Sequence, residues 1–373
     1  MQKIKVAEFV TRLEFGGVEA MILNYISHFS NKEIFDFHIV TQDINNNECI
    51  SLFRDQGFTV HIVTHKRKSI LKNVIEINSV LKKEKFDIVH CHMTLMNFYV
   101  LFLAWCHGVK VRISHSHNAF VSNNLVKIVF WRLIKQLNKI MSNIWIACGI
   151  DAGKFLYGEK ALNSSKVIIL KNAIDIEKYA YSLPKREKIR KKYYIDNDSF
   201  CVGHIGRFSE QKNHHFLLDV FEEILKSKPK SKLLLIGSGE GEKEIKETVK
   251  RKGLSDTVIF VGSATNTSDF YQAMDIFVLP SLFEGLPLVL VEAQASDLPC
   301  IVASTVDKRS KIKDDFLFLS LDDDKCYWAK MALTFANHVR TNDEISKITN
   351  AGYSIENEAI KLQNLYLSAM RNG

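Results

Sequence analysis

Short, continuous apolar runs alternate with longer amphipathic segments along the whole sequence. In the first half the runs are IKVAEFV, FDFHIVT, FTVHIVT, FDIVHCHM, VKVRISHS, NIWIACG and VIILKN; in the second half they are CVGHIG, SKLLLIGSG, VIFVG, IFVLPS and PCIVAS. Segments with helical periodicity, such as SILKNVIEINSVLKKEK and HHFLLDVFEEILKSK, lie between them. Strands that are apolar on both faces and separated by helices are typical of parallel sheets covered on both sides. The sequence therefore predicts an α/β protein with two doubly wound parallel sheets.

The length of 373 residues fits two domains of ordinary size. Apolar density falls and charge rises over residues 171–199, so we expect domains at 1–175 and 176–355. A last helical segment, 356–373, follows a long stretch without a clear strand and can pack back on the N-terminal domain. Because ligands of open α/β sheets bind at the carboxyl ends of the strands, we expect the two domains to face each other across a cleft.

The composition narrows the classes of function. With 46% apolar and 25% charged residues, the chain resembles a soluble globular protein. The N-terminal apolar run is too short for a secretory signal and no apolar window predicts a membrane span, so we expect a cytoplasmic protein. Seven cysteines without a C-x-x-C pair indicate reduced core thiols. The net charge of +8 favours anionic partners, but no nucleic-acid-binding module is recognisable.

Two glutamates stand eight positions apart in the apolar stretch SLFEGLPLVLVEAQASDLPC. IFVLPS is typical of a strand, LFEG of a loop and Pro287 of the first helical position, which places Glu284 at a helix start and Glu292 more than one turn inside. The free N–H groups of a helix start bind anions such as phosphate. The two carboxylates can then accept hydrogen bonds from ligand hydroxyls; solvated or charge-capping roles are the alternative.

Two cations, Arg207 and Lys212, follow the strand CVGHIG, which ends at Gly206. Beside a phosphate site at a strand end, they can neutralise a diphosphate. Most lysines and arginines are ordinary surface charges, and that is the alternative for these two.

Glycines mark two further loops. Gly16 and Gly17, between the first strand and its helix, permit a close backbone approach to a ligand or simply a tight turn. LLLIGSGEGEKEI contains Gly237 and Gly239 and resembles part of a dinucleotide fingerprint, but its third glycine position is Glu242. That departure counts against a nicotinamide enzyme.

Two His-x-His pairs stand at strand ends in the first half. VRISHSHNAF places His115 and His117 on one face if the strand continues, and DIVHCHM does the same with His90 and His92. A two-histidine face can begin a metal site, but neither pair brings an obvious Asp, Glu or Cys at ligand spacing. Acid-base or hydrogen-bonding work at the ligand is one interpretation, and histidines merely hydrogen-bonded in place are the other.

The segment 121–143, VSNNLVKIVFWRLIKQLNKIMSN, contains no acidic residue. Its basic residues are Lys127, Arg132, Lys135 and Lys139, and apolar residues alternate with them at roughly helical spacing. A basic amphipathic helix with aromatic residues suits an anionic membrane surface. A core helix with a solvated basic rim is the alternative.

Together these motifs resemble a known family. GRFSEQKN, LIGSGE, IFVG and SLFEGLPLVLVEAQASDLPC stand in its order between Phe200 and Thr305, and GGVE and SHSHN fit in the first half. The chain resembles the family-4 glycosyltransferases of the GT-B fold, especially bacterial members that build capsule or exopolysaccharide. The resemblance covers nearly the whole chain, and its E-x7-E pattern, Glu284 and Glu292, is specific because it follows a strand and includes EGLP.

The resemblance implies two Rossmann-like domains, with a donor nucleotide sugar, which we take to be a UDP-sugar, held mainly by the second. It implies retention at the anomeric carbon and no metal or other cofactor. Arg207 and Lys212 would bind the donor diphosphate and stabilise it as leaving group. Glu284 would contact hydroxyls of the donor sugar, and Glu292 the ribose.

The remaining implied site residues come from backbone and histidines. The glycines and turn residues expected at the donor are Gly206, Gly285, Leu286 and Leu288 from the second domain and Gly16 and Gly17 from the first. The active-site histidine looks most like His117, with His115 and His92 as secondary candidates. The family's glycine before the second proline of its motif is Asp297 here.

The leading hypothesis is a transferase that moves a hexose or N-acetylhexosamine from a UDP-sugar to a lipid-linked or oligosaccharide acceptor in surface polysaccharide biosynthesis. The segment 121–143 would hold it at the inner face of the plasma membrane. A nucleotide-sugar epimerase or hydrolase of the same fold is one alternative. A non-catalytic partner subunit is another, against which the complete set of Arg207, Lys212, Glu284 and Glu292 argues.

Overall fold

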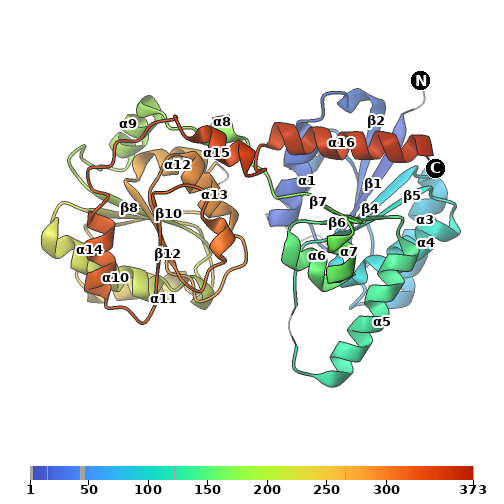
Figure 1. Ribbon diagram of the computed structural model, residues 1–373, viewed down its shortest axis with the longest axis horizontal. Helices are drawn as coiled ribbons and strands as arrows, with labels where there is room; N and C mark the ends of the chain where they lie inside the picture. Colours follow the sequence, from blue (N-terminus) through green and yellow to red (C-terminus); the bar gives the residue numbers. More distant parts are fainter. Residues whose placement is uncertain (1–2, 15, 43–46, 121, 265, 373) are drawn as a thin grey trace. The chain divides into compact units, whose positions relative to one another are not determined.

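The computed structural model describes residues 3–14, 16–42, 47–120, 122–264 and 266–372. The chain divides into two compact units, one formed by Met1–Ala173 with Ile355–Gly373 and the other by Ile174–Ser354. In Figure 1 each unit is a sheet flanked by helices, and the red C-terminal helix lies on the blue and green unit. Each unit has its own hydrophobic core.

The first unit, called unit 1, contains in its described residues a seven-stranded sheet in the order β3-β2-β1-β4-β5-β6-β7, with every pair parallel. Its strands are β1 (Ile4–Val10), β2 (Phe35–Thr41), β3 (Thr59–Ile62), β4 (Ile88–Cys91), β5 (Val111–Ser116), β6 (Ile144–Ala147) and β7 (Val167–Ile169). Its helices are α1 (Gly17–Ser27), α2 (Asn47–Asp55), α3 (Ile70–Glu84), α4 (Asn97–Cys106), α5 (Leu125–Met141), α6 (Ile150–Tyr157), α7 (Glu159–Asn163) and α16 (Ile355–Asn372), with the short 3₁₀ turns η1 (Lys32–Ile34) and η2 (Thr94–Met96).

The second unit, unit 2, has a parallel sheet in the order β10-β9-β8-β11-β12-β13. Its strands are β8 (Cys201–Ile205), β9 (Lys232–Ile236), β10 (Val258–Gly262), β11 (Ile276–Leu279), β12 (Cys300–Ala303) and β13 (Phe316–Leu319). Its helices are α8 (Ile176–Tyr179), α9 (Leu183–Lys192), α10 (His214–Ser227), α11 (Glu242–Arg251), α12 (Ser268–Ala273), α13 (Leu288–Ala295), α14 (Lys325–Leu333) and α15 (Ile345–Asn350), with η3 (Glu210–Lys212) and η4 (Lys308–Ser310).

The predicted pair of doubly wound parallel sheets is confirmed. The central strands β8, β11 and β12 are buried at every residue, as continuous apolar runs require when helices cover both faces. The strand order reverses between β1 and β4 in unit 1 and between β8 and β11 in unit 2. Ligands of open α/β sheets bind at such reversals, beyond the carboxyl ends of the strands.

One strand was not predicted. β13 is the four-residue run FLFL at the edge of the unit 2 sheet, and its two middle residues are only half-buried. Aspartates flank it closely on both sides, so the run is too short to stand out from a polar segment. The expectation of no strand between β12 and the last helix was therefore wrong.

The C-terminal helix α16 belongs to unit 1, where it packs against α1. Its buried residues recur at helical spacing: Ile355, Ala359, Leu362 and Tyr366. Gln363 fixes its register, because its Oε1 accepts the backbone N–H of Asn31 at 3.2 Å. Among the described helices, none is both long and apolar enough to cross a bilayer.

Candidate active site

Two loops meet where the strand order of unit 2 reverses. One follows β8 and contains η3; the other follows β11 and leads into α13. The backbone N–H of Leu282 donates to the carbonyl of Gln211 at 2.8 Å, and the Gln211 side chain donates to the carbonyl of Phe283 at 2.9 Å. These two bonds hold the loops side by side at the carboxyl edge of the sheet.

The paired loops bring Lys212 and Glu284 into contact. The Lys212 ammonium lies 2.5 Å from Oε1 of Glu284, and both side chains are largely buried. An ion pair that is mostly withdrawn from water is strong only if further groups satisfy its remaining protons and lone pairs. An anionic ligand with hydroxyl groups provides both kinds of partner.

Arg207 and Gly206 lie beside this pair in the same loop. Arg207 is exposed, and within the described residues its guanidinium has no hydrogen-bond or ion-pair partner. Gly206 lies against Lys212, because a Cβ there would be only 3.2 Å from Cε of the lysine. The two cations expected at a diphosphate therefore lie on one loop. Lys212 is paired with Glu284, and Arg207 has no partner among the described residues.

The glycines of LLLIGSGEG have a packing role that the sequence analysis missed. Gly237 has a positive φ of 140°, which L side chains rarely adopt, and a Cβ there would overlap the carbonyl of Gly206. A Cβ on Gly239 would likewise overlap the backbone of Phe208. These glycines let the loop after β9 lie directly against the loop that carries Arg207.

Two buried histidines, His204 and His214, support the same loop and were not predicted. Nδ1 of His204 lies 2.8 Å from the carbonyl of Val278, and the His214 ring stacks on Phe208 with centroids 4.4 Å apart. Burial first, and then the charge of Lys212, lowers the pKa of His214 to about 4. Both imidazoles are therefore neutral spacers beneath the cationic loop.

Glu292 lies in the middle of α13 and is only 8% exposed. Its carboxylate accepts hydrogen bonds from the hydroxyls of Tyr179 at 3.0 Å and Tyr271 at 2.7 Å. Burial raises the pKa of Glu292, and the two phenols act in the opposite direction. Each carboxylate oxygen of Glu292 still has a lone pair that can accept a further hydrogen bond. No spacing in the sequence pointed to either tyrosine.

The turn into α13 contains Gly285, Leu286 and Leu288, with Pro287 buried between them. Pro287 has φ −73° and ψ 123°, so it precedes the helix and Leu288 is the first helical residue, one position later than expected. The first N–H groups of a helix have no intrahelical partner. The geometry at this helix start is that of an anion site, with Glu284 just before it.

Asp297 occupies a left-handed conformation, with φ 52°, directly after α13. A glycine would adopt this conformation without strain. The aspartate is held by its side chain instead: its carboxylate pairs with the buried Lys313 and accepts the backbone N–H of Thr341 at 2.6 Å. These bonds preserve the turn where the family pattern has glycine.

In unit 1, Gly16 and Gly17 begin α1 at the strand-order reversal. Gly16 precedes the helix and Gly17 is its exposed first residue, with open space where a Cβ would stand. The carboxyl of Glu19 lies over Gly16, and burial raises its pKa to about 7. A carboxyl at a helix start can occupy the position of a bound anion.

The two His-x-His pairs come together on β4 and β5. Nδ1 of His92 lies 2.8 Å from Nε2 of His117, and Nε2 of His90 lies 3.1 Å from Nδ1 of His115. His117 is the partly exposed member, whereas the other three are buried. The structure thus places His92, His115 and His117 together, with His117 at the surface.

A carboxylate and a tyrosine complete this group, although neither His-x-His pair has an acidic residue at ligand spacing in the sequence. Oε2 of Glu8, from β1, lies 2.7 Å from Nε2 of His92, and its Oε1 accepts the hydroxyl of Tyr366 at 2.9 Å. Nδ1 of His90 lies 2.7 Å from the same hydroxyl. Glu8 was missed because its contacts lie 84 and 358 positions away in sequence.

Nitrogens of His90, His92 and His115 lie within 4.8 Å of one another, a spacing that can hold a metal ion. Their ring nitrogens, however, already face one another, His117, Glu8 or Tyr366 at hydrogen-bond distance, apart from the buried Nε2 of His115. We therefore interpret the group as a hydrogen-bonded array.

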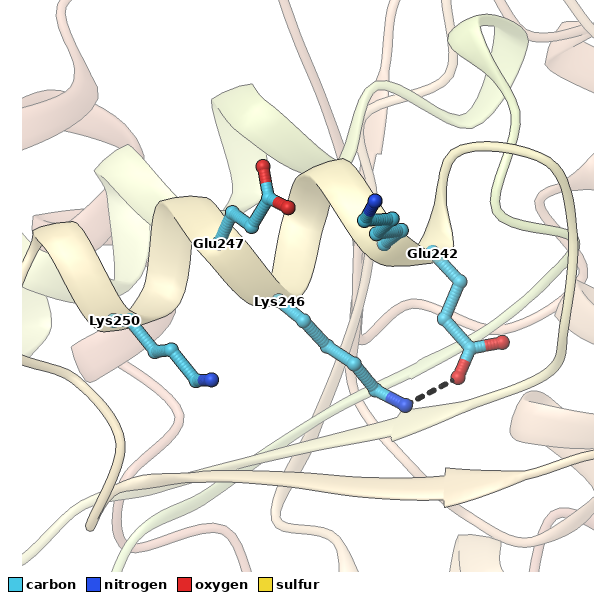
Figure 2. A pocket seen from close by; sticks show the side chains of 5 residues that line it. Glu242, Lys246, Glu247 and Lys250 are labelled. Carbon is cyan, nitrogen blue, oxygen red and sulfur yellow. Dashed lines mark hydrogen bonds and ion pairs between the residues drawn. The ribbon is translucent and has the colours of Figure 1, made fainter.

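A depression on α11 belongs neither to the loops around Lys212 in unit 2 nor to the histidine group of unit 1. It is lined by residues of that one helix: Glu242, Lys243, Lys246, Glu247 and Lys250 (Figure 2). The only dashed contact joins Lys246 to Glu242, four residues apart, at 2.6 Å. This is an ordinary solvated helix face, and Lys246 provides a control for Lys212.

Comparisons with known proteins identify the family. Residues 15–178 match the family model described as Glycosyltransferase Family 4, and residues 185–316 match Glycosyl transferases group 1. EpsF of Bacillus subtilis (strain 168), named as a glycosyltransferase, is 30% identical over 97% of this chain and 96% of its own length.

Two further matches also cover both units. The UDP-Gal:alpha-D-GlcNAc-diphosphoundecaprenol alpha-1,3-galactosyltransferase of Escherichia coli is 26% identical over 99% of this chain and 98% of that protein. The crystal structure of Anabaena HepE in complex with UDP and glucose aligns with a TM-score of 0.72 at 16% identity, over 99% of this chain and 98% of that one. The resemblance inferred from the motifs is confirmed: the chain belongs to the family-4 glycosyltransferases and is a transferase enzyme of the GT-B fold.

Proposed function

We propose that the protein transfers a hexose or N-acetylhexosamine from a UDP-sugar to a lipid-linked or oligosaccharide acceptor in surface polysaccharide biosynthesis, with retention and without a metal. In this proposal unit 2 binds the nucleotide sugar and unit 1 binds the acceptor and supplies His117. Arg207 and Lys212 bind the diphosphate, Glu284 the donor sugar and Glu292 the ribose.

The contact between Lys212 and Glu284 carries the proposal. It places a cation and a hydroxyl acceptor 2.5 Å apart at the strand-order reversal, beside the unpaired Arg207 and the start of α13. A sugar diphosphate needs this combination, because its phosphates require cations and N–H donors while its sugar requires carboxylate acceptors. Stabilising the departing diphosphate is then the main catalytic effect.

The names of relatives support the choice of donor and acceptor. The E. coli relative is named for transfer from UDP-Gal to a GlcNAc-diphosphoundecaprenol, and the Anabaena structure contains UDP and glucose. The Staphylococcus aureus relative CapH, 27% identical over 84% of this chain, is named for capsular polysaccharide biosynthesis. We take these as the substrate classes to test first.

The test is transfer from UDP-, GDP- and ADP-sugars to a prenyl-diphosphate sugar or an oligosaccharide, with EDTA present and products identified by mass spectrometry and NMR. We expect Lys212→Ala to lower kcat/KM by about 10²- to 10³-fold. Lys246→Ala, which removes an exposed ion pair of similar length, should change it less than twofold.

Other outcomes select the alternatives. Free sugar or an epimer formed without acceptor would replace the transfer proposal with the hydrolase or epimerase. Binding of a nucleotide sugar with no turnover of any acceptor would favour the partner subunit. Loss of activity in EDTA that Mg²⁺ restores would contradict the metal-independent mechanism.

The exposed face of α5 supports attachment to an anionic membrane surface. Its apolar residues Leu125, Val126, Val129, Phe130, Leu133 and Ile140 are 59–78% exposed. Only Ile134 and Asn138 of this helix are buried, so the helix is not the core helix of the alternative interpretation. Lys127 and Arg132 on the same helix are exposed cations for lipid headgroups. Residue 121 of the predicted segment 121–143 lies outside the described residues.

Vesicle flotation tests this attachment. We expect binding to vesicles that contain phosphatidylglycerol, much weaker binding to phosphatidylcholine alone, and a large loss in Val126→Asp. Leu71→Asp, on α3, changes a residue of similar exposure, 72% against 78%, and should bind as the native protein does. Equal flotation with and without anionic lipid would reject the surface.

A further inference from the structure

An unbroken hydrogen-bonded chain runs from the surface of unit 1 into its core. It begins at the partly exposed His117 and passes through His92 to Glu8, with N···N and N···O distances of 2.8 and 2.7 Å. A second arm runs from His115 through His90 and Tyr366 to the other oxygen of Glu8, with successive distances of 3.1, 2.7 and 2.9 Å. Both arms end on one carboxyl group.

Counting protons fixes the direction of each bond. When Glu8 is ionised it can only accept, so His92 donates from Nε2 and Tyr366 donates its hydroxyl. His92 must then accept at Nδ1 from Nε2–H of His117. Every link is satisfied with all the histidines neutral, and Nδ1 of His117 is left as an acceptor.

Protonating Glu8 at Oε2 reverses the first arm. The carboxylic acid then donates to Nε2 of His92, whose proton moves to Nδ1 and donates to Nε2 of His117. His117 now carries its proton on Nδ1. The state of Glu8 therefore determines whether the outer nitrogen of His117 accepts or donates a hydrogen bond.

We propose that Glu8 is a positioning residue that acts through His92 and His117, setting the His117 tautomer and storing the proton that His117 takes from the acceptor hydroxyl. This inference rests on the proposed transferase function for its catalytic part. The tautomer part rests only on the hydrogen-bonded array. Nothing in the sequence spacing of Glu8 and His117 would have connected them.

In the transfer step a proton moves inward along the first arm of the array. The acceptor O–H proton moves to Nδ1 of His117, Nε2–H of His117 passes to His92, and Nε2–H of His92 passes to Glu8. The acceptor oxygen keeps its electron pair and forms the bond to the anomeric carbon on the same face that the diphosphate leaves, as retention requires. The bond from that carbon to the diphosphate oxygen breaks, and its electron pair leaves with the diphosphate.

The surroundings of Glu8 suit a proton store. Burial raises its pKa to about 8, with the Tyr366 hydrogen bond acting in the opposite direction. The titratable groups around it are His90, Cys91 and His92 from β4 and its end, Tyr366 from α16 and Tyr25 from α1, with His115 and His117, from β5 and its end, behind the first two histidines. Within the described residues no lysine or arginine is ion-paired to it. Burial lowers the pKa of His92 to about 3, which keeps the intermediate ring neutral.

Side-chain ¹⁵N NMR of histidine tests the tautomer without any substrate. In the native protein we expect the proton of His117 on Nε2 above about pH 8 and on Nδ1 below it, the change following the ionisation of Glu8. Glu8→Gln should hold the Nδ1–H form at every pH, because the amide donates to His92 while its oxygen still accepts from Tyr366. A His117 tautomer unaffected by both pH and this substitution would overturn the proposal.

Kinetics test the catalytic part. In the native protein we expect kcat to rise with pH as Glu8 ionises, because only then can Nδ1 of His117 accept the proton. We expect Glu8→Gln to lower kcat by about 10²- to 10⁴-fold, with the KM for the nucleotide sugar within about twofold, and to remove this rise. Tyr366→Phe should still transfer sugar at high pH. The midpoint of the rise in kcat should move upward by about one pH unit, because ionised Glu8 loses the hydrogen bond from Tyr366. Glu8→Gln with native kcat and pH profile would overturn it.

Tyr25→Phe is the matched control. It removes a buried phenol of α1 that bonds to the carbonyl of Lys171 and lies outside the array, so both the tautomer and the midpoint should stay unchanged. If Glu8→Gln does not fold, the shift in Tyr366→Phe decides the question. If the native protein transfers no sugar, the proposed function fails. The NMR result still shows whether Glu8 sets the tautomer of His117.

Discussion

The turn after α13 shows how one residue can replace another of different type when its side chain supplies what the backbone lacks. Asp297 accepts a left-handed conformation that costs of the order of 1 kcal/mol, and its carboxylate holds Lys313, which is 5% exposed. The family that the sequence resembles has a glycine at this position. The structure shows that the helix ends there with the turn intact.

This arrangement predicts that Asp297→Asn destabilises unit 2 by about 3 kcal/mol, because the buried Lys313 loses its close partner and keeps only Glu344, at 3.9 Å. Urea unfolding measures the change. Burial acts to raise the pKa of Asp297, but His338 at 3.6 Å, the paired Lys313 and the backbone N–H of Thr341 together hold it well below its usual range. Its contribution is therefore present above about pH 4 and lost as the pH falls below it. A native-like stability of the variant at pH 7 would contradict this account.

The tyrosines on Glu292 lead to a second prediction at this scale. Removing one hydroxyl in Tyr271→Phe should weaken nucleotide-sugar binding by about fivefold, because the carboxylate loses a donor that fixes its position. Calorimetric titration measures the affinity. Tyr327→Phe, which changes a tyrosine that is 45% exposed, should bind as the native protein does. Equal affinities would show that Glu292 needs no such support.

Sequence alone reached some of these residues and not others. Lys212 and Glu284 follow strands whose ends can be located from their apolar runs, so their proximity could be predicted from topology. Tyr179, Tyr271 and Tyr366 could not, because they reach their partners from helices whose packing has no counterpart in local spacing. Glu8 sits inside an apolar strand, where only the structure reveals its partners.

At the level of elements, the pattern of apolar runs was sufficient to predict the strands that are buried on both faces. It failed for β13, where a short edge strand is only half-covered. For α16 it gave no physical basis for choosing the N-terminal domain as partner, since an amphipathic helix shows which of its faces is buried but not what covers it. Tertiary packing alone decides that partner.

The buried face of α16 can be tested directly. Leu362→Ala should destabilise unit 1 by about 2–5 kcal/mol, because Leu362 is 2% exposed and its loss leaves a cavity. Ile360→Ala, two residues away and 46% exposed, should cost less than about 1 kcal/mol. Thermal unfolding of the two variants gives the comparison. Similar costs would mean that the helix does not seal the core.

For the whole molecule, the buried carboxyl of Glu8 links stability to pH. Its pKa is about 8 when folded, against about 4.3 for an exposed glutamate, so the folded state binds the extra proton between these values. The stability that the neutral carboxyl contributes is complete below about pH 4 and is lost as the pH rises through about 8.

Glu8→Gln removes this dependence. The variant should therefore be more stable than the native protein at pH 8, by about 1–3 kcal/mol, and close to it at pH 5. Urea unfolding at the two pH values measures the difference. If the free energy of unfolding of the native protein instead rose from pH 5 to pH 8 relative to that of the variant, the raised pKa of Glu8 would be contradicted. Ionised Glu8 thus lowers the stability of the protein while it serves the proposed activity, as is common for groups in active sites.

The placement of α16 also imposes an order on biosynthesis. Unit 1 takes in residues 355–373, which the ribosome adds only after the whole of unit 2. Until then the sheet of unit 1 lacks Tyr366 and the apolar residues that cover α1. The hydrogen-bonded array on Glu8 therefore forms after unit 2 has been synthesised, so a nascent chain can fold unit 2 while unit 1 is still incomplete. A chain shortened before Tyr366 would lack the hydroxyl that binds Glu8, so the array would be incomplete.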